Sequence, residues 1–565
     1  MVRTFITKIS APVRGLHQAA YLLAALTLAS QALALLRDRI FAHVFGAGHV
    51  LDMYYAAFKI PDLVYALVVS LVSAYVLIPK IAALLKGGDQ AAARRLMSET
   101  ASFLLIGGGI FCGLLAVLAP KFLFLLFPEF NTPAYASQFV FLARILLMQP
   151  ILLGLSSILS SVTQLERRFF LFALSPVLYN AGIIFGTLVL YPYFGVLGIG
   201  IGVLAGAFVH QAIHVPVVWK ARLAPRLIIP RPRELWLVFR DSVPRSMALA
   251  MSSLTTLLLI ALASRQGEGG VAVFTLASNL EAVPLSLIGA AYATAAFPVL
   301  AEQAGAAKYD AFKQTVTAAA RHIIFWSSVI MVLTVVLRAH IVRIILGSGA
   351  FNWNNTRLTA AILAVLVIGL LAQGLILLCA RAFYAAGRSW NPLIVQLADC
   401  GISVAVAYGL VHMARVYPMV RYFMEAMLRI PDIPGSSVLF IAVGATVGQL
   451  LMGAAAMATL RVVAPGVARS LFRPLFDGLG AAILGGAAAY GTLSFMGALA
   501  PLTHLAIVFA EGLIAGIVGI SVAGAVLALL ENQEFKELVA SLRKITSLKP
   551  LPSYAPVTIH DGSDS

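Results

Sequence analysis

Long apolar segments follow one another along nearly the whole chain, separated by short polar breaks that contain charge, Pro or Gly. A helix that crosses a bilayer needs about 20 mostly apolar residues. The breaks divide the chain into fourteen such segments, at 17–45, 52–83, 101–127, 136–162, 169–191, 195–219, 241–264, 271–301, 322–346, 358–385, 391–412, 438–460, 475–496 and 502–530. The pattern predicts an all-α, polytopic membrane protein with about fourteen transmembrane helices.

The composition excludes a set of ordinary soluble domains. Of the 565 residues, 61% are hydrophobic and 11% are charged, and the mean hydropathy is +0.95. Soluble domains are roughly half apolar and about a quarter charged. Cys112, Cys379 and Cys400 lie in apolar surroundings without metal-binding or disulfide spacing, so we expect buried, inert thiols.

The positive charge of the chain is interpreted as a topology signal. The formal net charge is +17, which on a soluble protein would point to nucleic acid. With the N-terminus placed in the cytoplasm, Lys and Arg gather in the cytoplasmic connections, such as 80–95 and 220–233. The segment 415–432, with three arginines, is an exception on the outer side. The alternation predicts a multi-pass protein with both termini in the cytoplasm and no nucleic-acid partner.

Two matched proline contexts indicate an internal repeat. The second and eighth spans end in similar segments around Pro79 and Pro298, and the fifth and eleventh spans begin in similar segments around Pro176 and Pro392. The prolines are 97 residues apart in the first half and 94 in the second. Six spans followed by six in the same orientation are typical of a parallel repeat, whose two lobes bind substrate between them near mid-membrane.

The repeat predicts the domain organisation. We expect a cytoplasmic N-terminus at 1–16, an N-lobe at 17–219, a cytoplasmic linker at 220–240 and a C-lobe at 241–460. Two additional spans then occupy 461–530, and a cytoplasmic tail at 531–565 is expected to be disordered. The sequence contains no metalloprotease, Walker or Ser-His-Asp arrangement. The repeat and the missing catalytic motifs favour a secondary transporter over an enzyme. We expect a monomer, because each chain carries both lobes.

Several segments resemble a known family. "RDRIFAHVFGAGHVLDMYYAAFKIPDL", starting at Arg37, is similar to the MurJ/MviN family of lipid II flippases, in the multidrug/oligosaccharidyl-lipid/polysaccharide exporter superfamily. "PVLYNAGIIFG", "FPVLAEQAGAAKYDAF" and "ARAFYAAGRSWNP" extend the resemblance over about 22–460. It implies two lobes around a cationic cavity that carries lipid II from the cytoplasmic to the periplasmic leaflet of a bacterial inner membrane. The implied partners are this lipid-linked saccharide, membrane lipids and proteins of cell-wall synthesis.

The resemblance also implies the residues of a substrate site. The charged candidates are Arg37, Asp38, Asp52, Lys59, Glu281 and Arg381. Three further candidates, Gln31, Tyr65 and Asn279, are neutral at positions that the family links to the diphosphate through cationic side chains. A diphosphate is best held by charge-assisted donors.

The three neutral positions leave several readings open. Either the remaining cations make more of the contacts to the diphosphate, or the substrate is another polyprenyl-linked saccharide, or the protein is a non-transporting scaffold for envelope synthesis. Convergence of Arg37, Lys59 and Arg381 on an inter-lobe cavity would support transport.

Other intramembrane charges have simpler expected roles. Asp399, within the eleventh span, is a candidate site for a coupling cation or proton, because a lone intramembrane carboxylate is costly. No other cofactor is expected. Lys59 and Asp62, three residues apart on one helix face, are expected to pair. Arg39 is expected to extend its long side chain to the membrane interface.

Overall fold

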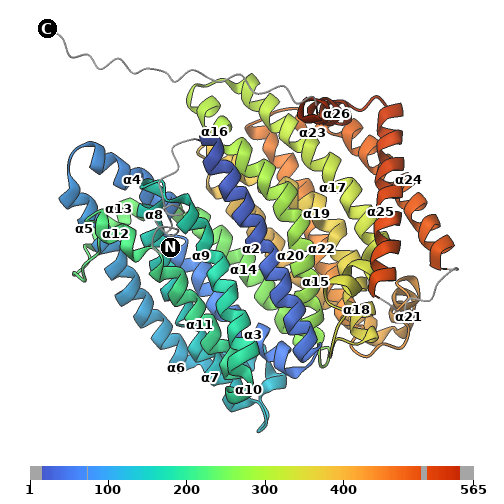
Figure 1. The fold of residues 1–565 in the computed structure, drawn as a ribbon, viewed down its shortest axis with the longest axis horizontal. Coiled ribbons are helices and arrows are strands. Elements are labelled where there is room, and N and C mark those ends of the chain that lie inside the picture. Colours follow the sequence, from blue (N-terminus) through green and yellow to red (C-terminus); the bar gives the residue numbers. More distant parts are fainter. Residues whose placement is uncertain (1–15, 73, 498–504, 547–565) are drawn as a thin grey trace, which may run out of the picture.

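The computed structural model describes residues 16–72, 74–497 and 505–546 of the chain, and Figure 1 shows them as a bundle of long helices. The first half contains α2 (Leu16–Phe45), α3 (His49–Val64), η1 (Tyr65–Val69), α4 (Ala74–Lys86), α5 (Gln90–Ser102), η2 (Phe103–Gly108), α6 (Gly109–Leu126), η3 (Pro128–Phe130), α7 (Ala136–Leu146), α8 (Gln149–Leu165), α9 (Phe169–Phe185), η4 (Gly186–Leu190), α10 (Tyr191–Phe194), α11 (Val196–Ala212) and α12 (Val215–Lys220).

A short connecting region follows, with α13 (Pro232–Phe239) and η5 (Arg240–Ser242). The second half contains α14 (Val243–Ser264), α15 (Gly270–Leu285), η6 (Ser286–Ala290), α16 (Ala291–Gly305), α17 (Tyr309–Ile345), α18 (Trp353–Leu366), η7 (Val367–Gly369), α19 (Leu370–Ala385), α20 (Trp390–Val416), α21 (Pro418–Met427), α22 (Val438–Thr459) and η8 (Leu460–Val462). The last elements are α23 (Val467–Ser470), α24 (Phe472–Gly497), α25 (Leu505–Leu529) and α26 (Gln533–Thr546).

The predicted spans agree closely with these helices. Among the described residues, twelve helices are long and apolar enough to cross a membrane, and they coincide with the third to fourteenth predicted spans. The first predicted span is α2, and the second is the run of α3, η1 and α4, within which Ser73 lies outside the described residues. That these two also cross the membrane stays a prediction. The all-helical, polytopic fold is confirmed.

The same helix pairs pack together in each half of the chain. In the first half α2 packs on α9 and α9 on α11, and in the second half α14 packs on α20 and α20 on α22. Small residues make the second of these contacts possible in both halves. A side chain at Gly182 would meet the backbone of Gly206, and one at Gly444 would meet Ala407. Close approach of this kind is how helices associate in membranes.

A π-helical turn interrupts the second span of each half at a corresponding place. The turn η1 follows Pro61 in α3, and the turn η6 follows Pro284 in α15. Proline has no N–H to donate to the preceding turn, and single π-helical turns often lie at functional sites. The two halves therefore share both a packing pattern and a local distortion.

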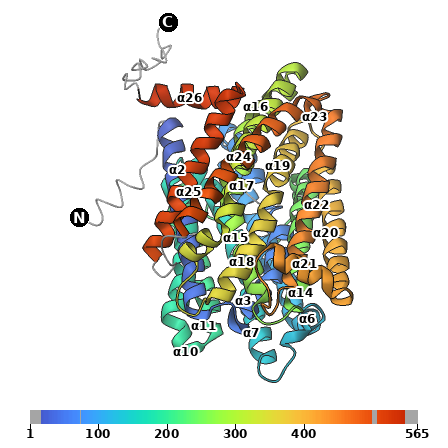
Figure 2. The ribbon, with the colours of Figure 1, turned by 90° about the vertical axis from the view of Figure 1, so that its right-hand side faces the viewer.

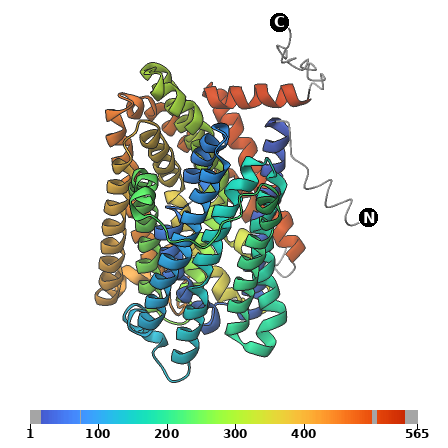
Figure 3. The ribbon, with the colours of Figure 1, turned by 90° about the vertical axis from the view of Figure 1, so that its left-hand side faces the viewer.

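The C-terminal helices correct one expectation. The helices α24 and α25 pack against α17, and α26 lies across the end of the bundle at which α2 begins (Figures 2 and 3). Glu534 of α26 pairs with Arg321, Glu537 lies 3.3 Å from His322, and Phe535 packs on the cluster around Phe325. The disorder expected from residue 531 onward is therefore wrong for 533–546, because α26 docks through both ion pairs and an aromatic side chain. Residues 547–565 lie outside the described part of the chain.

Candidate functional site

The two halves are joined at the end of the bundle opposite the start of α2. There, Arg39 of α2 donates to the backbone carbonyls of Ile344 and Ile345 at distances of 2.5 and 3.1 Å. The backbone N–H of Ala350 donates to the carbonyl of His43 at 2.9 Å. Arg39 thus caps the C-terminal end of α17 across the interface, where cations are favoured. It was expected at the membrane interface, and only the tertiary structure brings the C-terminal end of α17 to it as a partner.

Asp52 binds the N-terminal end of α15 from the other half. Its two carboxylate oxygens accept from the backbone N–H groups of Gly269 and Ala272 at 2.6 and 2.7 Å, and the side chain is buried. The first N–H groups of a helix have no partner within the helix, so a carboxylate is well placed there. In this structure Asp52 therefore serves the contact between the halves.

Two glycines allow the halves to approach at this end. Gly46 and Gly269 have φ of +61° and +82°, a conformation that favours glycine. A Cβ at Gly46 would lie 2.7 Å from the carbonyl oxygen of Ala350, and one at Gly269 would lie 2.5 Å from that of Ala47. We call the region made by residues 39–52 of the first half with 264–272 and 344–350 of the second the closed seam.

Arg37 and Asp38 lie on the inner side of the closed seam. Arg37 is eight residues, or about 12 Å, from the end of α2, and its Nη2 lies 2.8 Å from Oδ1 of Asp38. Its Nη1 donates to Oδ1 of Asn180 at 3.1 Å, and Nδ2 of Asn279 donates to Oδ2 of Asp38 at 2.9 Å. The cluster thus joins α2 and α9 of the first half to α15 of the second.

The accessibility of this pair is uneven. The Arg37 side chain is 19% exposed, whereas Asp38 is 4% exposed. The carboxylate of Asp38 is held by Arg37 and Asn279, so it fixes the guanidinium in place. A partly accessible guanidinium with a fixed orientation is a suitable donor for an anionic oxygen.

The remaining candidates of the first half lie along α2 and α3. Lys59 pairs with Asp62 at 3.7 Å, as the spacing predicted. Tyr65 is the first residue of η1 and is exposed, and Gln31 is half-buried on α2, six residues before Arg37. Among the described residues, no hydrogen bond joins Lys59, Tyr65 or Gln31 to Arg37.

Glu281 and Asp399 line one polar cavity inside the second half. The cavity has a volume of about 230 Å³ and lies among α14, α15, α19, α20 and α22. Nε2 of Gln373 donates to Oε1 of Glu281 at 2.5 Å and to Oε1 of Gln449 at 3.1 Å. Asp399 accepts from Ser403 and from Gln396, both at 3.2 Å. Two carboxylates that face one small intramembrane cavity can attract a cation or share a proton.

Arg381 lies in a different cavity, of about 200 Å³, together with Arg245, Tyr384 and Gln396. Its guanidinium is 5.5 Å from the ring centroid of Phe297. Arg381 is four residues from the end of α19, near the end of the bundle at which α2 begins. The structure therefore groups Arg37 with Asp38 and Asn279, and Glu281 with Asp399, while Arg381 lies in neither group.

The sequence reasoning missed the polar partners of these residues. Asn180, Gln373 and Gln449 complete the two clusters. Asn180 lies in "PVLYNAG", a segment already noted for its resemblance, so it could have been selected. The two glutamines lie in apolar runs, and nothing in those runs signals which helix they face.

Comparison with known proteins gives the family. The profile described as "Lipid II flippase MurJ" matches residues 41–421, which is most of the chain. The chain belongs to the MurJ family. It is 26% identical to the probable lipid II flippase MurJ of Thermotoga maritima over 385 residues, which cover 67% of this chain and 76% of that protein. It is also 26% identical to the corresponding protein of Bdellovibrio bacteriovorus over 407 residues, covering 69% and 76%.

Solved structures agree on the fold of this MurJ-family protein. A structure described as lipid II flippase MurJ in an inward closed conformation aligns with a TM-score of 0.70 at 17% identity, covering 91% of this chain and all of that one. An inward-facing multidrug resistance transporter of the MATE family aligns with a TM-score of 0.62 at 17% identity, covering 77% and 95%. The protein is therefore a multi-pass membrane transporter of the MurJ family and not an enzyme.

Proposed function

We propose that this protein moves lipid II, the polyprenyl-diphosphate-linked precursor of peptidoglycan, from the cytoplasmic to the periplasmic leaflet by alternating access. The observation that carries the proposal is the cluster of polar contacts between the halves at one end of the bundle. Asp52, Arg39 and the two glycines close one end, and the Arg37 cluster lies at the inner side of that closure. A head group that enters from the other end would meet Arg37 before it meets the seam.

The described ends of the chain support the orientation in this proposal. The start of α2 and the whole of α26 lie at the same end of the bundle, opposite the closed seam (Figures 2 and 3). With both termini in the cytoplasm, the closed seam faces the periplasm. The cavity with Arg381 and Arg245 then lies toward the cytoplasmic end of the second half, where its cations would attract an anionic head group.

Coupling forms a second part of the proposal. We place a candidate monovalent-cation or proton position in the cavity of Asp399 and Glu281, which Gln373 and Gln449 also line. The cavity lies wholly in the second half, so a bound cation would act on substrate movement through the packing of α14 and α15.

A different polyprenyl-linked saccharide is the second candidate substrate. The motivating observation is that the amide of Asn279 already donates to Asp38 and that Gln31 and Tyr65 are neutral. The diphosphate would then depend on fewer charged donors, each roughly twice as strong as a neutral one.

The deciding experiment is transport by the purified protein in vesicles. Fluorescent lipid II would be placed in one leaflet, and its appearance in the other would be followed over time. Arg37→Ala should lower the rate by at least about tenfold, the equivalent of one charge-assisted hydrogen bond of about 1.5 kcal/mol. Arg388→Ala, an exposed arginine of the α19–α20 turn, is the matched control and should leave the rate unchanged.

Each alternative predicts a different outcome of the same assay. Transport of another polyprenyl-linked saccharide with no transport of lipid II would support the second substrate. No transport of either, together with an Arg37→Glu variant that supports normal growth, would support a scaffold and overturn the proposal.

A further inference from the structure

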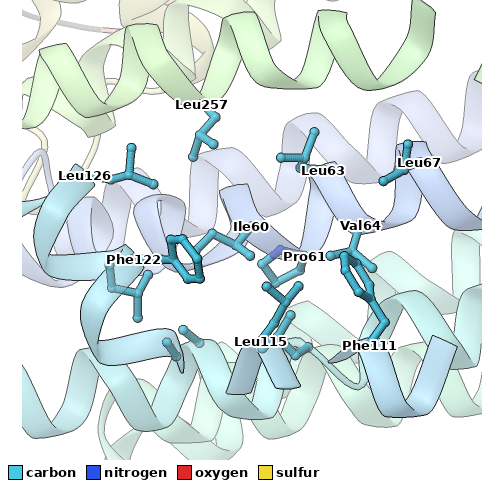
Figure 4. A pocket seen from close by; sticks show the side chains of 14 residues that line it. Ile60, Pro61, Leu63, Val64, Leu67, Phe111, Leu115, Phe122, Leu126 and Leu257 are labelled. Carbon is cyan, nitrogen blue, oxygen red and sulfur yellow. The ribbon is translucent and has the colours of Figure 1, made fainter. Parts of the chain in front are cut away.

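An apolar cavity of about 210 Å³ lies between α3, α6, α7 and α14, within the membrane-spanning part of the bundle (Figure 4). Its lining is built from aliphatic and aromatic side chains, among them Ile60, Val64, Leu115, Phe122 and Leu257. The lining offers hydrocarbon and aromatic contacts, which suit neither a phosphate nor a sugar. A hydrocarbon chain is the ligand that such a lining fits.

The cavity is elongated and reaches the outer surface of the bundle. Phe111 and Leu126 of α6 both line it, and fifteen residues of helix between them correspond to about 22 Å. Phe111 and Phe122 keep partly exposed side chains on α6, whose neighbouring residues Ile110, Val117 and Leu125 are 69–72% exposed on the outside of the bundle. A chain from the bilayer can therefore enter sideways, without crossing the polar interior.

Helix α3 links this cavity to the polar interior. Ile60, Val64 and Leu67 recur at helical spacing along α3 and η1 and line the cavity. Lys59 and Asp62, which form their ion pair on the same helix, are not among the lining residues. One helix thus presents an apolar face to the cavity while it carries a charged pair of the proposed substrate site.

Both halves of the protein contribute to the cavity wall. Leu257 belongs to α14 of the second half, and the other lining residues belong to the first half. α14 packs along both α3 and η1. A chain in the cavity therefore contacts both halves, and a movement of α14 relative to α3 changes the shape of the cavity.

We propose that this cavity holds a segment of the polyprenyl chain of the transported lipid while its head group lies near Arg37 and Lys59. The identity of that lipid rests on the proposed function. Bilayer chains are as apolar as the cavity, so the hydrophobic effect does not select the occupant. Selection comes from packing, because a chain that fills the cavity gains dispersion contacts that an ill-fitting chain forfeits. The branched polyprenyl chain is held here because its head group is anchored on the other face of α3.

The test is photo-crosslinking of a polyprenyl lipid from α6. A p-benzoylphenylalanine residue would replace Leu115, which lines the cavity, or Leu114, which is 54% exposed to the bilayer side. The purified variants would be placed in vesicles of phosphatidylethanolamine and phosphatidylglycerol containing undecaprenyl diphosphate without a saccharide. Capture of undecaprenyl diphosphate relative to phospholipid should be about tenfold higher at 115 than at 114, equivalent to about 1.4 kcal/mol of preferential binding.

Equal capture ratios at the two positions would overturn the inference, since ordinary bilayer chains would then fill the cavity. A second pair of variants guards against misfolding of the first. Leu257→Trp should narrow the cavity and lower capture at 115 toward the ratio at 114. Met247→Trp should not, because Met247 is exposed on the same α14 and lines neither this cavity nor that of Arg381.

The outcome is separable from that of the proposed function. Enriched capture without lipid II transport would contradict the proposed function and would leave the assignment of this cavity standing. Lipid II transport without enriched capture would contradict only the assignment of this cavity.

Discussion

Removal of the Asp52 carboxylate should open the closed seam. In the closed state its two oxygens accept from two buried backbone N–H groups, at 2.6 and 2.7 Å. When the halves separate at this end, water can satisfy all of these groups. The contacts therefore stabilise the closed state alone.

The magnitude follows from the groups that Asp52→Ala leaves behind. An unsatisfied buried N–H costs about 1–3 kcal/mol, and here there are two. Partial access of water lowers the sum, so we expect a loss of about 3 kcal/mol relative to the open state. Since about 1.4 kcal/mol is a factor of ten, the ratio of closed to open protein should fall by about a hundredfold.

Spin-label distances in reconstituted protein measure this ratio. Tyr193 on α10 and Met419 on α21 are both 80% exposed and belong to different halves, so labels there report the separation at the seam end. Cys112, Cys379 and Cys400 are free and buried, and they would first be replaced by Ala. Asp52→Ala should move most of the distance distribution to longer values.

The matched control is Glu268→Ala, across the same seam. Glu268 pairs with His49 at 3.3 Å, but both side chains are exposed, and such pairs contribute about 0–1 kcal/mol. The distribution should therefore remain near that of the unmodified protein. If Asp52→Ala leaves the distribution unchanged at an unaltered melting temperature, or if both variants shift it equally, the role assigned to Asp52 is wrong.

Two further predictions concern the seam and the polar cavity. Gly269→Ala should shift the same spin-label distances toward the open state, because a Cβ there would lie 2.5 Å from the carbonyl oxygen of Ala47. The control is Gly267→Ala, at φ of +119° with open space around it, which carries only the backbone strain of about 1–3 kcal/mol. An equal shift in both variants would refute the steric argument. Sodium or lithium ions at constant ionic strength should raise the melting temperature, and Asp399→Asn should abolish this rise. Ser403→Ala, which removes one hydrogen bond to Asp399, should reduce it. An undiminished rise in Asp399→Asn would exclude Asp399 as the cation position.

Local composition determined where the helices are. The bilayer admits only segments that satisfy their own backbone hydrogen bonds and are apolar over about 20 residues. Such a segment can be recognised from the local sequence alone. The third to fourteenth predicted spans accordingly coincide with helices of the structure. α26 was missed because its stability comes from docking onto Arg321 and Phe325, which lie more than 200 residues away in sequence.

The candidate site was predicted in part, and for a related reason. A charged residue in an apolar run is easy to recognise, so Arg37, Asp38, Glu281 and Asp399 could be selected from the sequence. Which polar residue each of them pairs with could not be predicted, because a pairing is fixed by which helix packs alongside and by its rotation about its own axis. Asn180 and Asn279 meet the Arg37 pair, and Gln373 meets Glu281, only through such packing.

The clearest division is therefore between the existence of a polar group and its role. Asp52 and Arg39 are equally conspicuous in the sequence as charges beside the Arg37 pair. Only the tertiary structure shows that both bind helix ends of the opposite half, where backbone N–H or carbonyl groups have no partner within the helix. The sequence by itself determined a two-fold repeated bundle of membrane helices with a few costly charges. The packing of one half against the other decided which charges close the seam and which, like Arg37, stay partly accessible.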